Sequence, residues 1–305
     1  GTLVVGATIV LAAAALHRAH PAPVRPLSVE ELLVLAQRER AGALPPTDVL
    51  ILGDSSALMD VDPVALGEDL GHAHVESLAT LAWVGPAGYA HILRQVLATQ
   101  RPARIVILMN GTGLQQEEAI YAGTGYEAMV LSDLPGPGYA RRQQLAADVR
   151  DGLFLESMQS VVDFPLPGSY GRTYGTPDDL VTYIRQHQGG LVDPNHYSGK
   201  RQEYVFRLSE ATASRLATLR EALALAAPSR VSFGITPVPD NEVGARTAES
   251  RAAVLAGVGR ALDLPDDALL DLPLSMFDAD FATSSHLGGA ARRVFTELVA
   301  RAVAR

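Results

Sequence analysis

The chain has 305 residues, and 48% of them are hydrophobic, so it is long enough and apolar enough to bury a large core. Its formal net charge is −9 and it has no basic run, which argues against a nucleic-acid-binding surface. It contains no cysteine, which excludes disulfide bonds, cysteine-ligated zinc sites and thiol catalysis.

Residues 1–16 form an uncharged hydrophobic segment. A membrane-spanning helix needs about 20 apolar residues. Because the sequence begins at Gly rather than Met, we expect the segment to belong to a longer hydrophobic helix, and we interpret it as a transmembrane anchor. The alternatives are a signal-peptide core, favoured by the small residues 12–15, and a buried helix of a soluble fold. Arg18 and Arg25 follow closely and argue mildly against a translocated C-terminal side.

Residues 17–46 are interpreted as a linker with a short helix, which a capping box at Ser28 and Glu31 begins. Beyond it, short apolar runs alternate with helical patterns. The predicted strands are 48–53, 74–78, 104–109 and 230–236, and the predicted helices are 63–70, 86–99, 209–226 and 288–304. This order predicts an α/β domain over residues 47–305, built as a three-layer, doubly wound parallel sheet with its ligand site at the carboxyl ends of the strands.

The stretch from about 112 to 207 fits the alternation poorly and is rich in Gly and Pro, so we predict a long insertion over the functional edge of the sheet. Within it, Asp193-Pro-Asn-His196 is open to interpretation as a substrate-contacting or metal-binding loop. One histidine and one aspartate are poor evidence for a metal, and a turn is the preferred interpretation. We predict neither a metal nor a cofactor.

Two short motifs carry the residue types of a serine nucleophile and its base. Ser55 follows the first strand in Gly53-Asp54-Ser55, at the edge where a ligand site is expected. His286 precedes the last helix, and a serine needs such a base because its hydroxyl is inert at neutral pH. Turn residues and a solvated or packed histidine are the simpler interpretations of either motif alone.

In this order the two motifs resemble the SGNH (GDSL-like) hydrolase superfamily. They are most similar to its membrane-anchored, acyltransferase-like branch, which includes proteins of alginate O-acetylation and teichoic-acid D-alanylation. The segments that match are 53–66, 78–94, 105–111 and 281–287, so the resemblance covers about residues 48–111 and 228–305. The resemblance implies that Ser55 is the nucleophile and His286 the base, with Gly85 and Asn110 contributing to the oxyanion hole.

The sequence departs from the family pattern at the acid. Thr283 occupies the place of the carboxylate that orients the histidine. We expect Asp280 to substitute for it, with Asp278 or a Ser–His dyad as alternatives. Gly111-Thr112 and Gly288 depart from the pattern as well.

The resemblance implies a serine-dependent O-acyltransferase or acyl esterase that acts on a cell-envelope glycan, with acetyl as the expected acyl group. It implies a bacterial cell membrane location, an extracytoplasmic domain and a multi-spanning membrane acyltransferase as partner. The alternative is a catalytically degenerate subunit with a structural role in a membrane complex, which both Thr283 and the N-terminal hydrophobic segment favour. Four aromatic residues are candidates either for stacking on sugar rings or for core packing: Trp83, Tyr89, Tyr170 and Tyr174.

Overall fold

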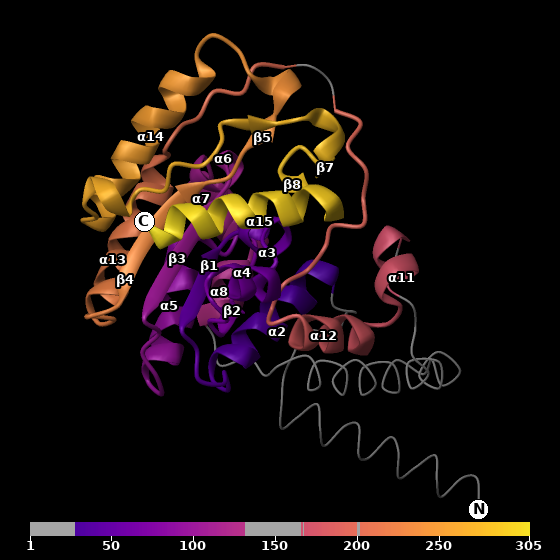
Figure 1. Ribbon diagram of the computed structural model, residues 1–305, viewed down its shortest axis with the longest axis vertical. Helices are drawn as coiled ribbons and strands as arrows, with labels where there is room; N and C mark the ends of the chain where they lie inside the picture. Colours follow the sequence, from indigo (N-terminus) through magenta and orange to yellow (C-terminus); the bar gives the residue numbers. More distant parts are fainter. Residues whose placement is uncertain (1–27, 132–165, 167, 200–201) are drawn as a thin grey trace, which may run out of the picture.

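The computed structural model describes residues 28–131, 166, 168–199 and 202–305 (Figure 1). The predicted anchor at 1–16 lies outside these residues, as does the first part of the predicted linker. Among the residues that are described, no helix has the length and apolar character that crossing a membrane requires.

The core is a four-stranded parallel sheet in the order β2-β1-β3-β4. Its strands are β1 (Val49–Gly53), β2 (Val75–Ser77), β3 (Arg104–Met109) and β4 (Arg230–Ile235). Every residue of β1 and β2 is buried, as expected for parallel strands that are covered on both faces. The four strands predicted from the sequence are therefore confirmed, and the chain has an α/β fold with a parallel sheet flanked by helices.

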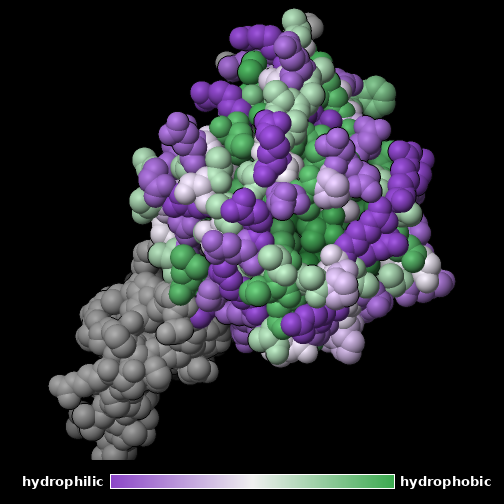
Figure 2. All heavy atoms as spheres, turned by 90° about the vertical axis from the view of Figure 1, so that its left-hand side faces the viewer, coloured by the Kyte–Doolittle hydropathy of each residue, from purple (hydrophilic) through white to green (hydrophobic). Residues whose placement is uncertain are grey.

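Helices pack on this sheet in two groups. The connections from β1 to β2 and from β2 to β3 run in opposite directions across the sheet, so right-handed crossovers place their helices on opposite faces. On one face α4 (Pro63–Asp69) packs against α15 (Gly289–Ala304), which crosses in front of the strands in Figure 1. On the other face α5 (Gly85–Leu97) packs against α13 (Glu210–Ala224). Figure 2 shows the side with α5, α13 and α14 (Thr247–Leu262), where hydrophilic residues border a band of apolar ones.

Helix α2 (Val29–Ala41) begins at the predicted capping box, in which Ser28 and Glu31 exchange hydrogen bonds. The sequence suggested a helix within a linker, but its apolar side belongs to the core of the domain. At its other end Arg40 pairs with Glu76 of β2, and both side chains are buried. The folded unit therefore begins before residue 47.

The insertion contains short helices, as its sequence suggested. They are α6 (Gly111–Leu114), α7 (Glu118–Thr124), α8 (Tyr126–Leu131), α11 (Gly168–Tyr174) and α12 (Pro177–Gln186). After β4 the chain forms β5 (Val238–Pro239), η1 (Asp240–Glu242), α14, η2 (Asp266–Ala268), β6 (Ser275–Met276) and η3 (Asp278–Asp280). It then forms the hairpin of β7 (Phe281–Thr283) and β8 (His286–Leu287), which leads into α15.

Candidate active site

Ser55 lies at the carboxyl edge of the sheet, where β1 ends and α3 (Ser55–Asp60) begins. The turn depends on Gly53, whose φ is +140° and where a Cβ atom would lie 1.8 Å from the carbonyl oxygen of Leu108 on β3. Only glycine allows this approach. Asp54 caps α3 by accepting hydrogen bonds from the Ser56 backbone N–H at 3.0 Å and the Ser56 hydroxyl at 2.6 Å. The buried neighbours of Ser55 thus fix its backbone and leave its own side chain facing the pocket.

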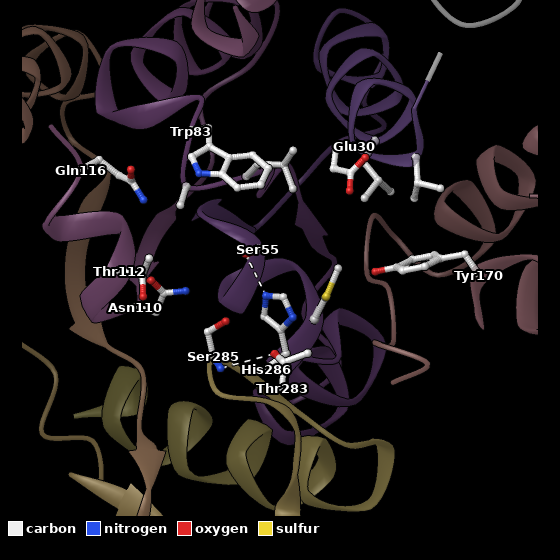
Figure 3. A pocket seen from close by; sticks show the side chains of 15 residues that line it. Glu30, Ser55, Trp83, Asn110, Thr112, Gln116, Tyr170, Thr283, Ser285 and His286 are labelled. Carbon is white, nitrogen blue, oxygen red and sulfur yellow. Dashed lines mark hydrogen bonds between the residues drawn. The ribbon is translucent and has the colours of Figure 1, made fainter. Parts of the chain in front are cut away.

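His286 reaches Ser55 from the hairpin of β7 and β8. Thr283 and His286 face each other across the hairpin, and the Ser285 N–H donates to Thr283 Oγ1 at 3.4 Å. The His286 Nε2 atom lies 2.9 Å from Ser55 Oγ, within hydrogen-bonding distance (Figure 3). The structure therefore brings together the two residues that the sequence singled out, from the first and last strands of the chain.

The carboxylate that contacts His286 is Asp193, and not Asp280 as expected from the sequence. Asp193 Oδ2 lies 2.6 Å from His286 Nδ1. Asp280 instead lies in η3, where its backbone carbonyl accepts the Gly288 N–H at 2.7 Å. The expectation for Asp280 failed because it assumed that the acid comes from the same loop as the histidine. Thr283 occupies the expected acid position and shapes the hairpin.

Asp193 belongs to the insertion, and the two residues before it are bonded to α3 and to α11. The Leu191 N–H donates to the carbonyl of Leu58 at 3.1 Å, and the Val192 N–H donates to the Tyr174 hydroxyl at 3.0 Å. The turn predicted at 193–196 is present as well, because Asp193 Oδ1 accepts the Asn195 N–H at 2.9 Å. One carboxylate thus fixes its own turn with one oxygen and contacts the imidazole with the other.

The surroundings of Asp193 favour its charged form. Burial by itself would raise the pKa of this carboxyl, but the hydrogen bond and charge of His286 and the hydrogen bonds from Asn195 outweigh burial, so the pKa lies below its ordinary value. A charged Asp193 accepts a hydrogen bond from the N–H of His286 Nδ1, which leaves Nε2 unprotonated and able to accept the Ser55 hydroxyl proton. This is the arrangement that general-base activation of a serine requires.

Ser55 and His286 open into a pocket of about 300 Å³. The described residues that line it come from α2, α3, α11, the loop after β2, the segment after β3 and the β7–β8 hairpin. They are Val29, Glu30, Leu33, Ser55, Met59, Leu81, Ala82, Trp83, Asn110, Thr112, Gln116, Tyr170, Thr283, Ser285 and His286. In the described part of the chain no cluster of histidine and acidic side chains is arranged to hold a metal ion.

Asn110 lies at the end of β3, where it caps α6. Its Oδ1 accepts the Gly113 N–H at 2.7 Å, and its backbone N–H donates to Asp54 Oδ2 at 2.8 Å. Because Oδ1 is occupied by the cap, the amide nitrogen is the end that faces the pocket (Figure 3). The amide nitrogen is therefore the donor that the oxyanion role implied by the resemblance would use.

Gly85, the other predicted oxyanion residue, does not line this pocket. It begins α5 with a φ of +67°, and a Cβ atom there would lie 2.5 Å from the ring of Tyr121. The loop before it does line the pocket through Leu81, Ala82 and Trp83. Of these residues, Ala82 has a backbone N–H with no acceptor within the described part of the chain, so it is a candidate backbone donor in place of Gly85.

The four aromatic candidates divide into two pairs. Trp83 and Tyr170 line the pocket, and the Trp83 ring stacks on Tyr126 with 5.6 Å between centroids. Tyr89 is fully buried and donates to the carbonyl of Leu81 at 3.0 Å. Tyr174 packs edge-on against Tyr183. Trp83 and Tyr170 are therefore available to a ligand, whereas Tyr89 and Tyr174 are structural.

No protein-family model matches the chain, and no curated protein gives a significant match to it. The assignment of the site therefore depends on its own geometry.

Asp60 of α3 stabilises the β7–β8 hairpin through a backbone hydrogen bond. It is fully buried, and its Oδ1 accepts the Leu287 N–H, next to His286, at 2.7 Å. Its Oδ2 has no hydrogen-bond partner among the described residues. Burial raises the pKa of Asp60 well above its ordinary value, and the hydrogen bond from Leu287 only partly offsets this. The native state therefore favours a neutral Asp60.

We expect Asp60→Asn to remove the decrease in folding stability that Asp60 causes as pH rises. Between the unfolded pKa of about 3.9 and the raised native pKa, the native wild-type protein binds one proton more than the unfolded chain, so its stability falls by up to about 1.4 kcal/mol per pH unit as pH rises. The asparagine does not titrate and still accepts the Leu287 N–H. Urea unfolding from pH 4.5 to 8 should show the variant gaining stability relative to wild type as pH rises. A constant difference across this range would contradict the account.

Two substitutions at Asn110 separate its role as the cap of α6 from its proposed role as an oxyanion donor. Asn110→Asp keeps an oxygen for the Gly113 N–H but removes the pocket-facing amide donor, so kcat should fall by about 10²–10³-fold while stability holds. Asn110→Ala should lose the same activity and about 1 kcal/mol of stability in addition. The measurements are ester hydrolysis and thermal unfolding. An aspartate variant with wild-type kcat would exclude the oxyanion role.

Proposed function

We propose that this protein is a serine-dependent acyl esterase or O-acyltransferase. The observation that carries the proposal is the continuous hydrogen-bonded chain from Ser55 Oγ through His286 to Asp193, with distances of 2.9 Å and 2.6 Å, at the edge of a pocket. Nucleophile, base and orienting carboxylate come from three distant segments. Their convergence in this order is the recurring arrangement of serine-dependent acyl transfer on unrelated folds.

The residues supply each step of the reaction. Ser55 Oγ attacks the ester carbonyl while its proton passes to His286 Nε2, and the Asn110 amide and the Ser55 and Ala82 N–H groups stabilise the tetrahedral oxyanion. The intermediate collapses, His286 protonates the departing alcohol, and an acyl-Ser55 ester remains. Water or an acceptor hydroxyl then gives its proton to His286 and attacks this ester, which releases the acid or the new ester and restores Ser55.

The resemblance to the membrane-anchored branch of the SGNH superfamily directs the proposal towards a cell-envelope glycan. The exposed ring of Trp83 at the pocket supports a sugar acceptor, since aromatic faces pack well against sugar rings. We propose on the same grounds an extracytoplasmic domain on a bacterial cell membrane, anchored through residues 1–16, with a multi-spanning membrane acyltransferase as acyl donor. Residues 1–16 lie outside the described part of the chain and give this location no structural support.

The non-catalytic alternative was favoured by Thr283 at the expected acid position. Asp193 supplies the carboxylate that this position lacks, so that observation no longer favours a degenerate site. We therefore propose the catalytic function alone.

The proposal is tested by incubating the protein with p-nitrophenyl acetate, with and without a cell-wall oligosaccharide acceptor. Release of p-nitrophenol supports acyl transfer to Ser55, and mass spectrometry of the oligosaccharide distinguishes transfer to sugar from hydrolysis. Acylated oligosaccharide would identify a transferase, and free acetate alone an esterase. A folded protein that releases no p-nitrophenol above the rate of Ser55→Ala would refute both.

A further inference from the structure

The pocket has two sides of different chemistry on either side of Ser55. Figure 3 shows Glu30 and Tyr170 on one side and Asn110, Thr112 and Gln116 on the other. The first side is formed by α2 and α11 and the second by the segment that follows β3. The acyl group and the alcohol group of an ester bound at Ser55 therefore contact different sides of the pocket.

The side formed by α2 is apolar apart from its rim. Val29 and Leu33, one residue before and three residues after Glu30, both line the pocket and are almost completely buried. Met59, one helical turn after Ser55 on α3, adds a flexible thioether wall close to the nucleophile. Val29, Leu33 and Met59 carry no charge, so Glu30 is the charged residue on this side of the described pocket lining.

The opposite side carries polar groups. Beyond Asn110, the amide of Gln116 and the hydroxyls of Thr112 and Ser285 line it. Such groups suit a hydroxyl-bearing alcohol, whereas an alkyl chain would leave them without partners. The division assigns the alcohol half to the segment after β3 and the acyl half to α2.

We propose that the side between α2 and α3, lined by Val29, Leu33 and Met59, binds a neutral acyl chain longer than acetyl. This inference rests on the proposed function, since it names the acyl group that Ser55 accepts. Acetyl has a single methyl group and would leave this wall empty. Each additional methylene that the wall buries should stabilise the transition state by about 0.8 kcal/mol, which is a factor of about four in kcat/KM.

Glu30 at the rim adds a second element of selectivity. Glu30 lines the pocket with Tyr170, and burial, followed by the charge of Asp193 and more weakly that of Glu30, raises the pKa of the Tyr170 phenol. An acyl chain that ends in its own carboxylate, such as succinyl, would bring another negative charge to this rim. The site should therefore reject dicarboxylic acyl groups, and Glu30→Gln should relax that rejection.

The test compares kcat/KM for p-nitrophenyl acetate, butanoate and hexanoate, and for the hemisuccinate. Wild type should prefer butanoate to acetate by about 15-fold, because two buried methylenes each contribute a factor of about four. Val29→Trp, which fills this side from the first turn of α2, should reverse the preference, whereas Leu33→Ala should shift it towards hexanoate. Thr112→Val is the matched control on the polar side and should leave the chain-length ratios unchanged. Circular dichroism melting establishes that each variant is folded.

The outcomes separate this inference from the function on which it rests. Ser55-dependent turnover that is fastest with acetate, or ratios that neither Val29→Trp nor Leu33→Ala alters, would overturn the acyl assignment and leave the esterase intact. Equal turnover of wild type and Ser55→Ala on every ester would overturn the function itself. Hemisuccinate turnover equal to that of butanoate in wild type would overturn the role of Glu30.

Discussion

Replacing Asp193 by asparagine should lower kcat for ester hydrolysis by about 10⁴-fold with little change in KM. The variant keeps an oxygen that accepts the Asn195 N–H, so the turn at 193–196 survives. Its amide, however, presents a donor to His286 Nδ1 and drives the proton to Nε2. The imidazole is then in the tautomer that cannot accept the Ser55 proton.

Asp280→Asn is the matched control, because this residue lies in the loop where the sequence placed the acid. Its contact with the hairpin is made by its backbone carbonyl, which the substitution leaves in place. Activity within a few-fold of wild type is expected. If Asp280→Asn were the variant that lost activity and Asp193→Asn were not, the assignment of the acid would be wrong.

The largest loss is expected for Ser55→Ala, at about 10⁶-fold in kcat, since the reaction then has no nucleophile. Within the described part of the chain the Ser55 hydroxyl hydrogen-bonds to His286, so removing it should leave the fold unchanged. Ser285→Ala tests the same chemistry one residue from the base. Ser285 lines the pocket, but its hydroxyl makes no recorded contact with His286, so this variant should retain most of the activity. Equal losses in both variants would indicate a damaged pocket, and an active Ser55→Ala would exclude Ser55 as the nucleophile.

The parallel sheet was predictable because its strands are short, continuous apolar runs. The sequence 104–109 contains only apolar residues after Arg104, and five of its six residues are buried. His286 lies on the antiparallel β7–β8 hairpin, outside this sheet, so its pairing with Ser55 was predicted from the family resemblance. The position of Ser55, by contrast, followed from the strand pattern. Residues that follow parallel strands gather at one edge, and this requires no knowledge of side-chain packing.

The acid was not predictable in this way because Asp193 lies on no strand of the sheet. Its position depends on how the insertion folds back onto the domain, where the Leu191 N–H bonds to α3 and the Val192 N–H bonds to Tyr174 of α11. The available signal was Asp193-Pro-Asn-His196, which combines a turn motif with a carboxylate next to a buried apolar run. The prediction of a turn at 193–196 is confirmed, but a turn motif does not indicate which residue the second carboxylate oxygen of Asp193 contacts.

The local sequence pattern also gave an incomplete prediction for two helices, α2 and α14. Helix α2 lies next to a proline-rich stretch and was assigned to a linker, yet its contribution to the core comes from packing that only the folded chain reveals. Helix α14 was not predicted, because its Ala- and Gly-rich sequence gives little contrast between its two faces. Tertiary contacts decide both cases.

The central claim is that Ser55 is a nucleophile activated by His286 and Asp193. It is tested most directly by treating the folded protein with a p-nitrophenyl alkylphosphonate and mapping the adduct by peptide mass spectrometry. The account predicts one adduct per chain, on Ser55, formed with release of p-nitrophenol and much more slowly in Asp193→Asn. An unmodified Ser55 in a folded protein, or an adduct on another serine, would contradict it.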